Sequence, residues 1–175
     1  MRGLLTFGHG TAAPDELVGL TTNAGIEQVV DVRRFPGSRR NPGLSNDAMG
    51  TWLPEAGVDY LWEPRLGGRR RLPAGQDDDV DGWWRVAGFR AYAAHMRTEE
   101  FCDGLEVLLE RMGHAQTAIM CSESLWWRCH RRLVSDAVLL LHDRPVHHLG
   151  HDGRLTEHLP PPAATIVAGE LRYDA

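Results

Sequence analysis

The densest group of chemically active side chains occurs at positions 120–132. These thirteen positions hold two thiols, a carboxylate, an imidazole, two indoles and three guanidiniums: Cys121, Cys129, Glu123, His130, Trp126, Trp127, Arg128, Arg131 and Arg132. An apolar run precedes the segment and an amphipathic one follows it, which indicates the turn between a buried strand and a helix. Cations at a helix start oppose the helix dipole, which favours anions. We therefore expect an anionic ligand to bind there, among backbone N–H groups and arginines.

Two carboxylates are candidates for acid–base chemistry. Asp31 lies at the end of an apolar run that predicts a strand, and Glu123 comes two positions after Cys121 at the end of another. Either can position water or accept a proton, and two carboxylates on adjacent strands can divide the acid and base roles. Asp31 can equally cap a loop or pair with a neighbouring arginine.

The thiols allow two other chemistries. Cys121, at a strand-to-helix turn beside arginines, could ionise and act as a nucleophile of the rhodanese or phosphatase type. The segment from Cys121 to Arg128 lacks, however, the glycine-rich spacing that lets backbone amides surround a tetrahedral anion. Cys121, Cys129 and His130 could instead bind zinc with a later histidine, but the spacing is not that of a zinc finger or ribbon. We therefore expect no metal and no cofactor, and we expect Cys129 to pack under the helix.

Arginines and tryptophans indicate the class of ligand. Arginine binds phosphate, and an indole stacks on a planar ring, as a nucleotide or an unstacked base requires. Glycines on both sides of His9 permit close approach to a ligand. The expected substrate-binding residues are His9, Arg33, Arg34, Arg39, Arg65, Trp62, Trp126, Trp127, Arg128 and Arg131.

Length and composition limit the number of domains, the kinds of partner and the cellular compartment that the protein can have. The chain has 175 residues, the size of one domain, and a formal net charge of −5, which argues against a nonspecific nucleic-acid coat. All 19 cationic side chains are arginine. Three cysteines without a signal peptide or an apolar run of membrane-spanning length favour a reduced, cytoplasmic protein and no membrane partner. The oligomeric state does not follow from the sequence.

The elements that must position these residues are strands separated by helices. Short apolar runs predict strands at 4–7, 29–32, 58–62, 117–121 and 146–149, and helical patterns occupy the segments after position 14, 45–55, 89–96, 99–112 and about 127–142. This alternation predicts a single α/β domain with a mostly parallel sheet flanked by helices. Ligands bind such sheets at the carboxyl ends of the strands, so we expect a crevice there. Residues from about 160 to 175, beginning at Pro160-Pro161-Pro162, are expected to be a loosely constrained tail.

Several segments together resemble DUF488, a family of unknown function. The resemblance rests on Thr6–Gly10, Val30–Arg33 with the Pro36 loop, Pro64–Gly68, Tyr92–Phe101, Cys121–Glu123 and Cys129–Arg131. It implies a compact α/β fold and no settled activity. The chain departs from the family pattern at Gly10, where a serine often follows the Gly-His pair.

The leading hypothesis is a hydrolase that acts on a nucleotide or nucleic acid, in its concrete form an N-glycosidic bond cleavage like that of a DNA glycosylase. Asp31 and Glu123 would activate water, with Cys121 and His130 as further catalytic candidates. Two alternatives stay open: a thiol enzyme centred on Cys121, and a module that binds phosphate or nucleic acid without turnover.

Overall fold

The computed structural model describes residues 3–37, 41–72, 75 and 80–174, so Arg39 lies outside the described residues. The strands are β1 (Leu4–Gly8), β2 (Gln28–Asp31), β3 (Asp59–Trp62), β4 (Thr117–Cys121), β5 (Val146–Leu149), β6 (Leu155–Glu157), β7 (Ala164–Val167) and β8 (Glu170–Tyr173). The α-helices are α1 (Pro14–Asn23), α2 (Asn46–Glu55), α3 (Ala87–His95), α4 (Glu99–His114) and α5 (Arg131–His142). Single turns of 3-10 helix cover η1 (Pro42–Leu44), η2 (Pro64–Leu66) and η3 (Trp126–Arg128).

Local capping explains where several helices begin. Pro14 supplies the fixed φ that suits a first helical position, and the Glu16 carboxylate accepts a hydrogen bond from the Ala13 N–H at 2.7 Å. The Ser45 hydroxyl accepts from the Ala48 N–H at 3.2 Å and starts α2. Thr98 caps α4 in the same way. Each cap satisfies a backbone donor that the helix itself leaves free.

The central sheet has six strands in the order β3-β2-β4-β1-β5-β6. The first five run parallel, and β6 returns antiparallel beside β5. Gly8 is in register with Cys121 and Asp31 with Met120, so β1, β4 and β2 end at nearly the same level. The predicted α/β fold with a mostly parallel sheet and flanking helices is confirmed.

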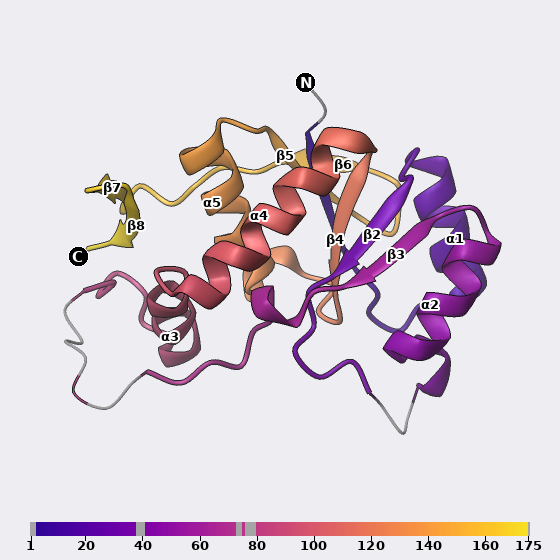
Figure 1. The fold of residues 1–175 in the computed structure, drawn as a ribbon, viewed down its shortest axis with the longest axis horizontal. Coiled ribbons are helices and arrows are strands. Elements are labelled where there is room, and N and C mark those ends of the chain that lie inside the picture. Colours follow the sequence, from indigo (N-terminus) through magenta and orange to yellow (C-terminus); the bar gives the residue numbers. More distant parts are fainter. Residues whose placement is uncertain (1–2, 38–40, 73–74, 76–79, 175) are drawn as a thin grey trace.

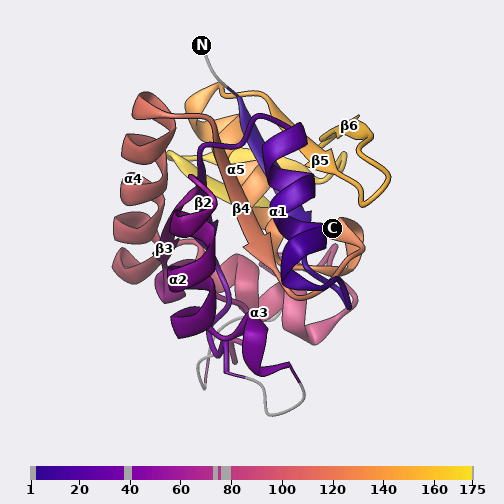
Figure 2. The same cartoon turned by 90° about the vertical axis from the view of Figure 1, so that its right-hand side faces the viewer.

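The helices form two layers, one on each side of the sheet (Figures 1 and 2). On one side α1 and α2 pack through Leu17, Met49 and Leu53. On the other side α3, α4 and α5 form the larger core, which includes Phe101 and Leu133. Neighbouring residues of a strand point to opposite faces, and Val29 and Val30 accordingly belong to the two different clusters.

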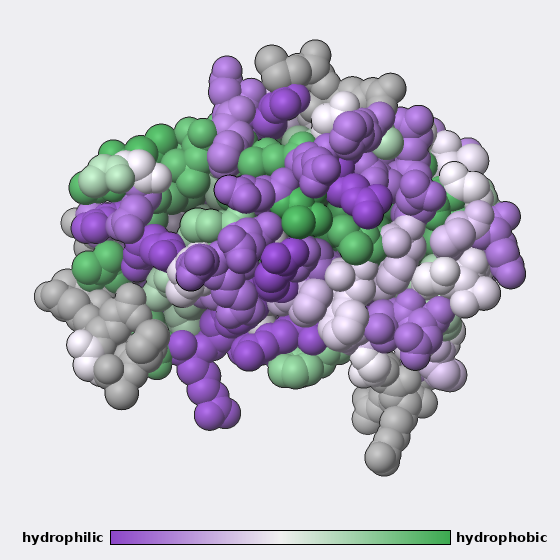
Figure 3. All heavy atoms as spheres, in the orientation of Figure 1, coloured by the Kyte–Doolittle hydropathy of each residue, from purple (hydrophilic) through white to green (hydrophobic). Residues whose placement is uncertain are grey.

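The segment expected to be a loose tail is ordered. β7 and β8 pair antiparallel through a turn at Ala168 and Gly169, whose φ values of 52° and 83° suit a two-residue hairpin. Leu171 and Tyr173 are buried in the larger core. Figure 3 shows hydrophobic side chains at the end of the molecule that carries this hairpin, where Ile166 is exposed. The prolines at 160–162 thus precede a structured element.

The start of α5 differs from its expected position. The sequence predicted a helix from about Trp127, but η3 ends at Arg128 and α5 begins at Arg131. Between them Cys129 has extended backbone angles, with φ −122° and ψ 149°. This break turns the chain so that Cys129 and His130 precede the helix instead of lying within it. None of the described helices is both long and apolar enough to cross a membrane.

Candidate functional site

A cavity of about 440 Å³ lies at the carboxyl ends of β1, β2 and β4. It is lined by residues of four separate segments: His9, Arg33, Arg34, Phe35, Pro36, Gly37, Asn41, Leu44, Gly68, Arg69, Cys121, Ser122, Glu123, Arg128, Cys129 and His130. These segments follow β1, β2, β3 and β4, at the strand ends where a crevice was expected. The lining contains four arginines and one carboxylate, so the cavity favours an anion.

Asp31 does not face this cavity as a free base. Its carboxylate is fully buried and accepts hydrogen bonds from the Arg33 guanidinium at 2.6 and 2.9 Å and from the Tyr60 hydroxyl at 2.6 Å. Arg33 also donates to the Leu44 carbonyl and to His9 Nε2. Asp31 therefore holds Arg33 at the edge of the cavity, and its expected catalytic role has no geometric support.

His9 is held between Arg33 and the turn after β1. Its Nδ1–H donates to the Gly10 carbonyl at 2.9 Å, which leaves Nε2 as the acceptor for Arg33 at 3.2 Å. Burial, followed by the positive charge of Arg33, lowers the pKa of His9 although the hydrogen bond to Gly10 opposes this. His9 thus enters the cavity as a neutral side chain.

The three cations near the start of α5 have three different environments. Arg131 is 1% exposed, and it donates to the Glu123 carbonyl and, through Nε, to Cys129 Sγ at 3.4 Å. Arg132 lies over the Trp84 ring with 4.8 Å to the ring centroid. Arg128 lines the cavity, and its guanidinium has no hydrogen-bond partner among the described residues. Only Arg128 of the three is placed to bind a ligand.

Glu123 is the carboxylate that lines the cavity. Its Oε1 accepts from the Leu125 N–H at 3.1 Å. Its backbone packs directly on Gly8, where a β-carbon would overlap the Glu123 carbonyl group, and that carbonyl also accepts from Arg131. The close approach of β1 and the loop after β4 therefore fixes Glu123 at the cavity wall.

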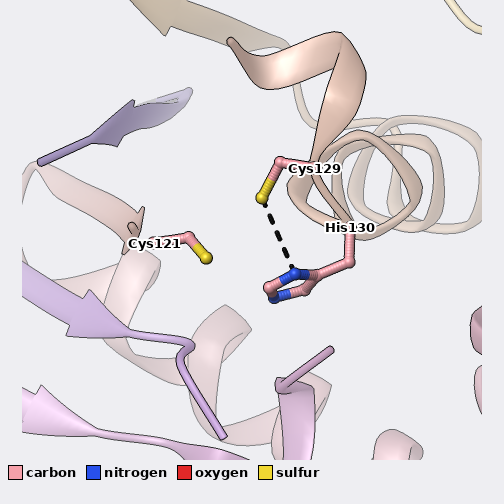
Figure 4. A group of neighbouring side chains, drawn as sticks. All are labelled: Cys121, Cys129 and His130. Atoms are coloured by element: carbon pink, nitrogen blue, oxygen red, sulfur yellow. Dashed lines mark hydrogen bonds between the residues drawn. The ribbon is translucent and has the colours of Figure 1, made fainter. Parts of the chain in front are cut away.

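Two thiols and an imidazole that line the cavity lie close to one another (Figure 4). The ligand atoms of Cys121, Cys129 and His130 all lie within 4.8 Å of one another. His130 Nε2–H donates to the Val32 carbonyl at 3.0 Å, and its Nδ1 lies 3.6 Å from Cys129 Sγ. Both thiols are free and buried. The cluster forms because β4 ends at Cys121 while the break before α5 turns Cys129 back toward it.

The two thiols have opposite pKa shifts. A hydrogen bond from Cys121 and the positive charge of Arg131 lower the pKa of Cys129 to about 6 against the effect of burial. The same hydrogen bond, together with burial, raises the pKa of Cys121 to about 12. Of the two thiols, Cys129 is therefore the one that ionises more readily.

The tryptophans lie away from the cavity. The Trp62 Nε1–H donates to the Arg33 carbonyl at 2.8 Å, and Trp126 stacks on His148 with 3.9 Å between ring centroids. Trp127 is 49% exposed, but among the described lining residues there is no tryptophan. Besides the two histidines, the ring that lines the described part of the cavity is that of Phe35, which is 64% exposed. The tryptophans that were expected to stack on a base are therefore not part of the described cavity lining.

The structure brings together half of the residues that the sequence singled out. Those at the cavity are His9, Arg33, Arg34, Cys121, Glu123, Arg128 and His130. Asp31, Arg65, Trp62, Trp126, Trp127 and Arg131 do not line it; Arg65, for example, pairs with Glu63 at 2.7 Å. Cys129, Phe35 and Arg69 are additional lining residues. The position of Cys129 next to His130 could have indicated that it belongs to the site. The sequence instead predicted a helix from about Trp127, which would have placed Cys129 within that helix.

The fold and this cavity define an α/β protein with an anion-favouring site at the strand ends. The sequence model of a family described as "Domain of unknown function DUF488" matches residues 13–138. The chain belongs to this family, and its resemblance in sequence is confirmed. Comparisons with curated proteins and with solved structures gave no match.

Proposed function

We propose that the protein is a hydrolase that binds a nucleotide or a nucleic-acid segment through its phosphate in the strand-end cavity. One observation carries the proposal: the Glu123 carboxylate and the unpartnered Arg128 guanidinium line the same cavity. Arginine binds phosphate by charge-assisted hydrogen bonds, and a carboxylate fixed beside it can take a proton from water. Cations and a base that share one cavity are what hydrolysis of an anionic substrate requires.

The lining residues divide into three roles. Arg34 and Arg128 bind the phosphate, because Arg33 is already occupied by Asp31. Glu123 removes a proton from the attacking water and returns it to the leaving group. Phe35 offers its exposed ring to the base, and Arg34 lies 5.4 Å from that ring's centroid. Arginine beside an aromatic face is a common platform for single-stranded nucleic acid.

The decisive experiment compares Glu123→Gln with the exposed control Glu55→Gln. Mononucleotides and short oligonucleotides are incubated with each protein, and released base and released phosphate are separated by chromatography. We expect turnover by the wild type and by Glu55→Gln, and a loss of about 100-fold or more in Glu123→Gln, the range for a general base. Base release would indicate N-glycosidic cleavage, and phosphate release would indicate a phosphohydrolase. Tight binding without turnover in the wild type would leave a binding module and refute the hydrolase.

A thiol enzyme is the second candidate, because two thiols line the same cavity. The geometry favours Cys129 over Cys121 as the nucleophile, since Cys129 lies two positions before the first residue of α5 and contacts Arg131. Cys129→Ser would then abolish turnover while Glu123→Gln spares it.

Free thiols in the described chain are also the reason to place the protein in the cytoplasm, where they stay reduced.

A further inference from the structure

We propose that Cys121, Cys129 and His130 bind one Zn²⁺ ion and leave its fourth coordination position open to the cavity. The three side chains come from two elements, the end of β4 and the turn before α5, and they point toward one another (Figure 4). Their ligand atoms lie within 4.8 Å of one another. All three residues also line the cavity.

The distances suit tetrahedral zinc. Bond lengths of about 2.3 Å to sulfur and 2.0–2.1 Å to nitrogen place neighbouring ligand atoms roughly 3.5–3.8 Å apart. Cys129 Sγ and His130 Nδ1 are separated by 3.6 Å, which already meets this value. The limit of 4.8 Å on the remaining pairs means that side-chain shifts of an ångström or less complete the triangle.

The orientation of His130 is a second, independent observation. Its Nε2–H donates to the Val32 carbonyl at 3.0 Å, so Nδ1 carries a lone pair and faces the sulfurs. A metal-binding histidine commonly donates its other ring N–H to a backbone carbonyl, which fixes both the tautomer and the ring plane. Val32 directly follows β2, so the central sheet sets the direction of this ligand.

Gly68 provides the space that this ring needs. A β-carbon at position 68 would lie 2.7 Å from His130 Nδ1 and 3.1 Å from Cγ. Any side chain there would force the imidazole out of its present position. The loop at Gly67 and Gly68 therefore forms a cradle around the nitrogen that would bind the metal.

The donor set selects the metal and the type of site. Two thiolates and one imidazole favour zinc over magnesium or calcium, which prefer oxygen ligands. Two thiolates neutralise Zn²⁺, and Arg131 Nε donates to Cys129 Sγ at 3.4 Å, which further stabilises the sulfur charge. Among the described residues the cluster holds these three ligands alone. Three protein ligands and one open position are the pattern of catalytic rather than structural zinc.

The role of the metal rests on the proposed function, whereas its binding does not. Zinc lowers the pKa of a water in its open position toward neutrality. With a metal bound there, Glu123 would be the residue that accepts a proton from the attacking water and returns it to the leaving group. This would give the hydrolase its nucleophile, while the arginines hold the anionic group.

The test measures metal binding without any substrate. Protein purified with a phosphine reductant is analysed for zinc by mass spectrometry and titrated with Co²⁺, whose thiolate charge-transfer absorption reports sulfur ligation. We expect one equivalent of metal in the wild type and in Cys102→Ser, which removes an exposed cysteine outside the cluster. Affinity should fall by at least about 100-fold in Cys121→Ser, Cys129→Ser and His130→Ala. Equal binding by all four variants, or none by the wild type, would overturn the site.

A measurement on the unmodified chain guards against misfolded variants. Zn²⁺ should slow alkylation of Cys121 and Cys129 but not of Cys102, as peptide mass spectrometry can resolve. Equal alkylation of all three with and without zinc contradicts the proposal. Metal binding without hydrolysis would retain the site and refute the proposed function, whereas full hydrolysis by metal-free protein would retain the function and refute the metal's role in it.

Discussion

Asp31 and Arg33 form a buried ion pair in which each carboxylate oxygen accepts a hydrogen bond from the guanidinium, at 2.9 and 2.6 Å. Asp31→Asn would leave the arginine charge buried without its counter-ion. We expect the free energy of unfolding to fall by about 3–5 kcal/mol, as measured by urea denaturation, with Asp103→Asn on the exposed face of α4 as a near-neutral control. Unchanged stability together with lost turnover would instead make Asp31 catalytic.

Arg128→Ala tests the anion site without disturbing the fold. Because its guanidinium has no partner among the described residues, we expect stability to change by no more than about 0.5 kcal/mol. The dissociation constant for a mononucleotide should rise by about 10-fold, the lower end for a lost charged hydrogen bond. Calorimetric titration measures both this variant and the exposed control Arg85→Ala. Equal affinity in the two variants would remove Arg128 from the site.

Gly8→Ala tests the contact that fixes Glu123. The added methyl group would overlap the Glu123 carbonyl, so the loop after β4 must shift. We expect a loss of stability of at least about 1–3 kcal/mol, typical of overpacking. Gly19→Ala in α1 is the matched control, since its β-carbon meets nothing within 4 Å and alanine stabilises a helix interior by about 0.5–1 kcal/mol. Thermal unfolding should move in opposite directions for the two variants.

His148 predicts a specific dependence of stability on pH. It lies in a buried chain of hydrogen bonds from Thr6 through His148 and His158 to Asp136 and Tyr173. Burial, and next the neighbouring His158, lower its pKa from 6.5 to about 3. The unfolded chain therefore binds the extra proton first, and stability falls as pH decreases from 6.5 toward 3.

The slope attributable to His148 approaches about 1.4 kcal/mol per pH unit within that window. His9 and His95 also have lowered pKa values and act in the same direction, so the comparison must be a difference between proteins. We expect His148→Gln to be less stable at pH 7 but to show a flatter profile between pH 6.5 and 5. Parallel profiles in urea denaturation would show that His148 does not titrate between the two states.

The β7–β8 hairpin gives a prediction about the end of the chain. Leu171 is 2% exposed and packs in the larger core, whereas Ile166 in the same hairpin is 51% exposed. Leu171→Ala should cost about 2–5 kcal/mol through the cavity it leaves, and Ile166→Ala less than about 1 kcal/mol. Equal small effects in denaturant titrations would mean that the hairpin does not contribute to the folded core.

The sheet was predictable from the sequence because its strands are short apolar runs separated by helical patterns. Because parallel strands end at one edge of a sheet, the same patterns predicted that His9, Glu123 and His130 lie at that edge. The hairpin at 164–173 was missed because three prolines suggested disorder, while the burial of Leu171 depends on contacts with distant helices.

The hydrogen-bond and stacking partners of individual side chains could not be predicted from the sequence. Asp31 is bound by Tyr60, 29 positions away, and Trp126 of η3 stacks on His148 of β5. Neither contact has a local signal, because both join elements that are far apart in the sequence. The extended backbone at Cys129 is a further example, since amphipathic periodicity continues through it.

The segment that matches the family model is shorter than the segment that forms the sheet. The family match begins at residue 13 and ends at residue 138, so it omits β1 and β5. β1 lies in the interior of the sheet, where β4 pairs with one of its edges and β5 with the other. A polypeptide restricted to the matched residues would expose the hydrogen-bonding edge of β4 and lose the wall that supports Glu123. Boundaries for expression or for domain transplantation must therefore follow the sheet and include both flanking segments.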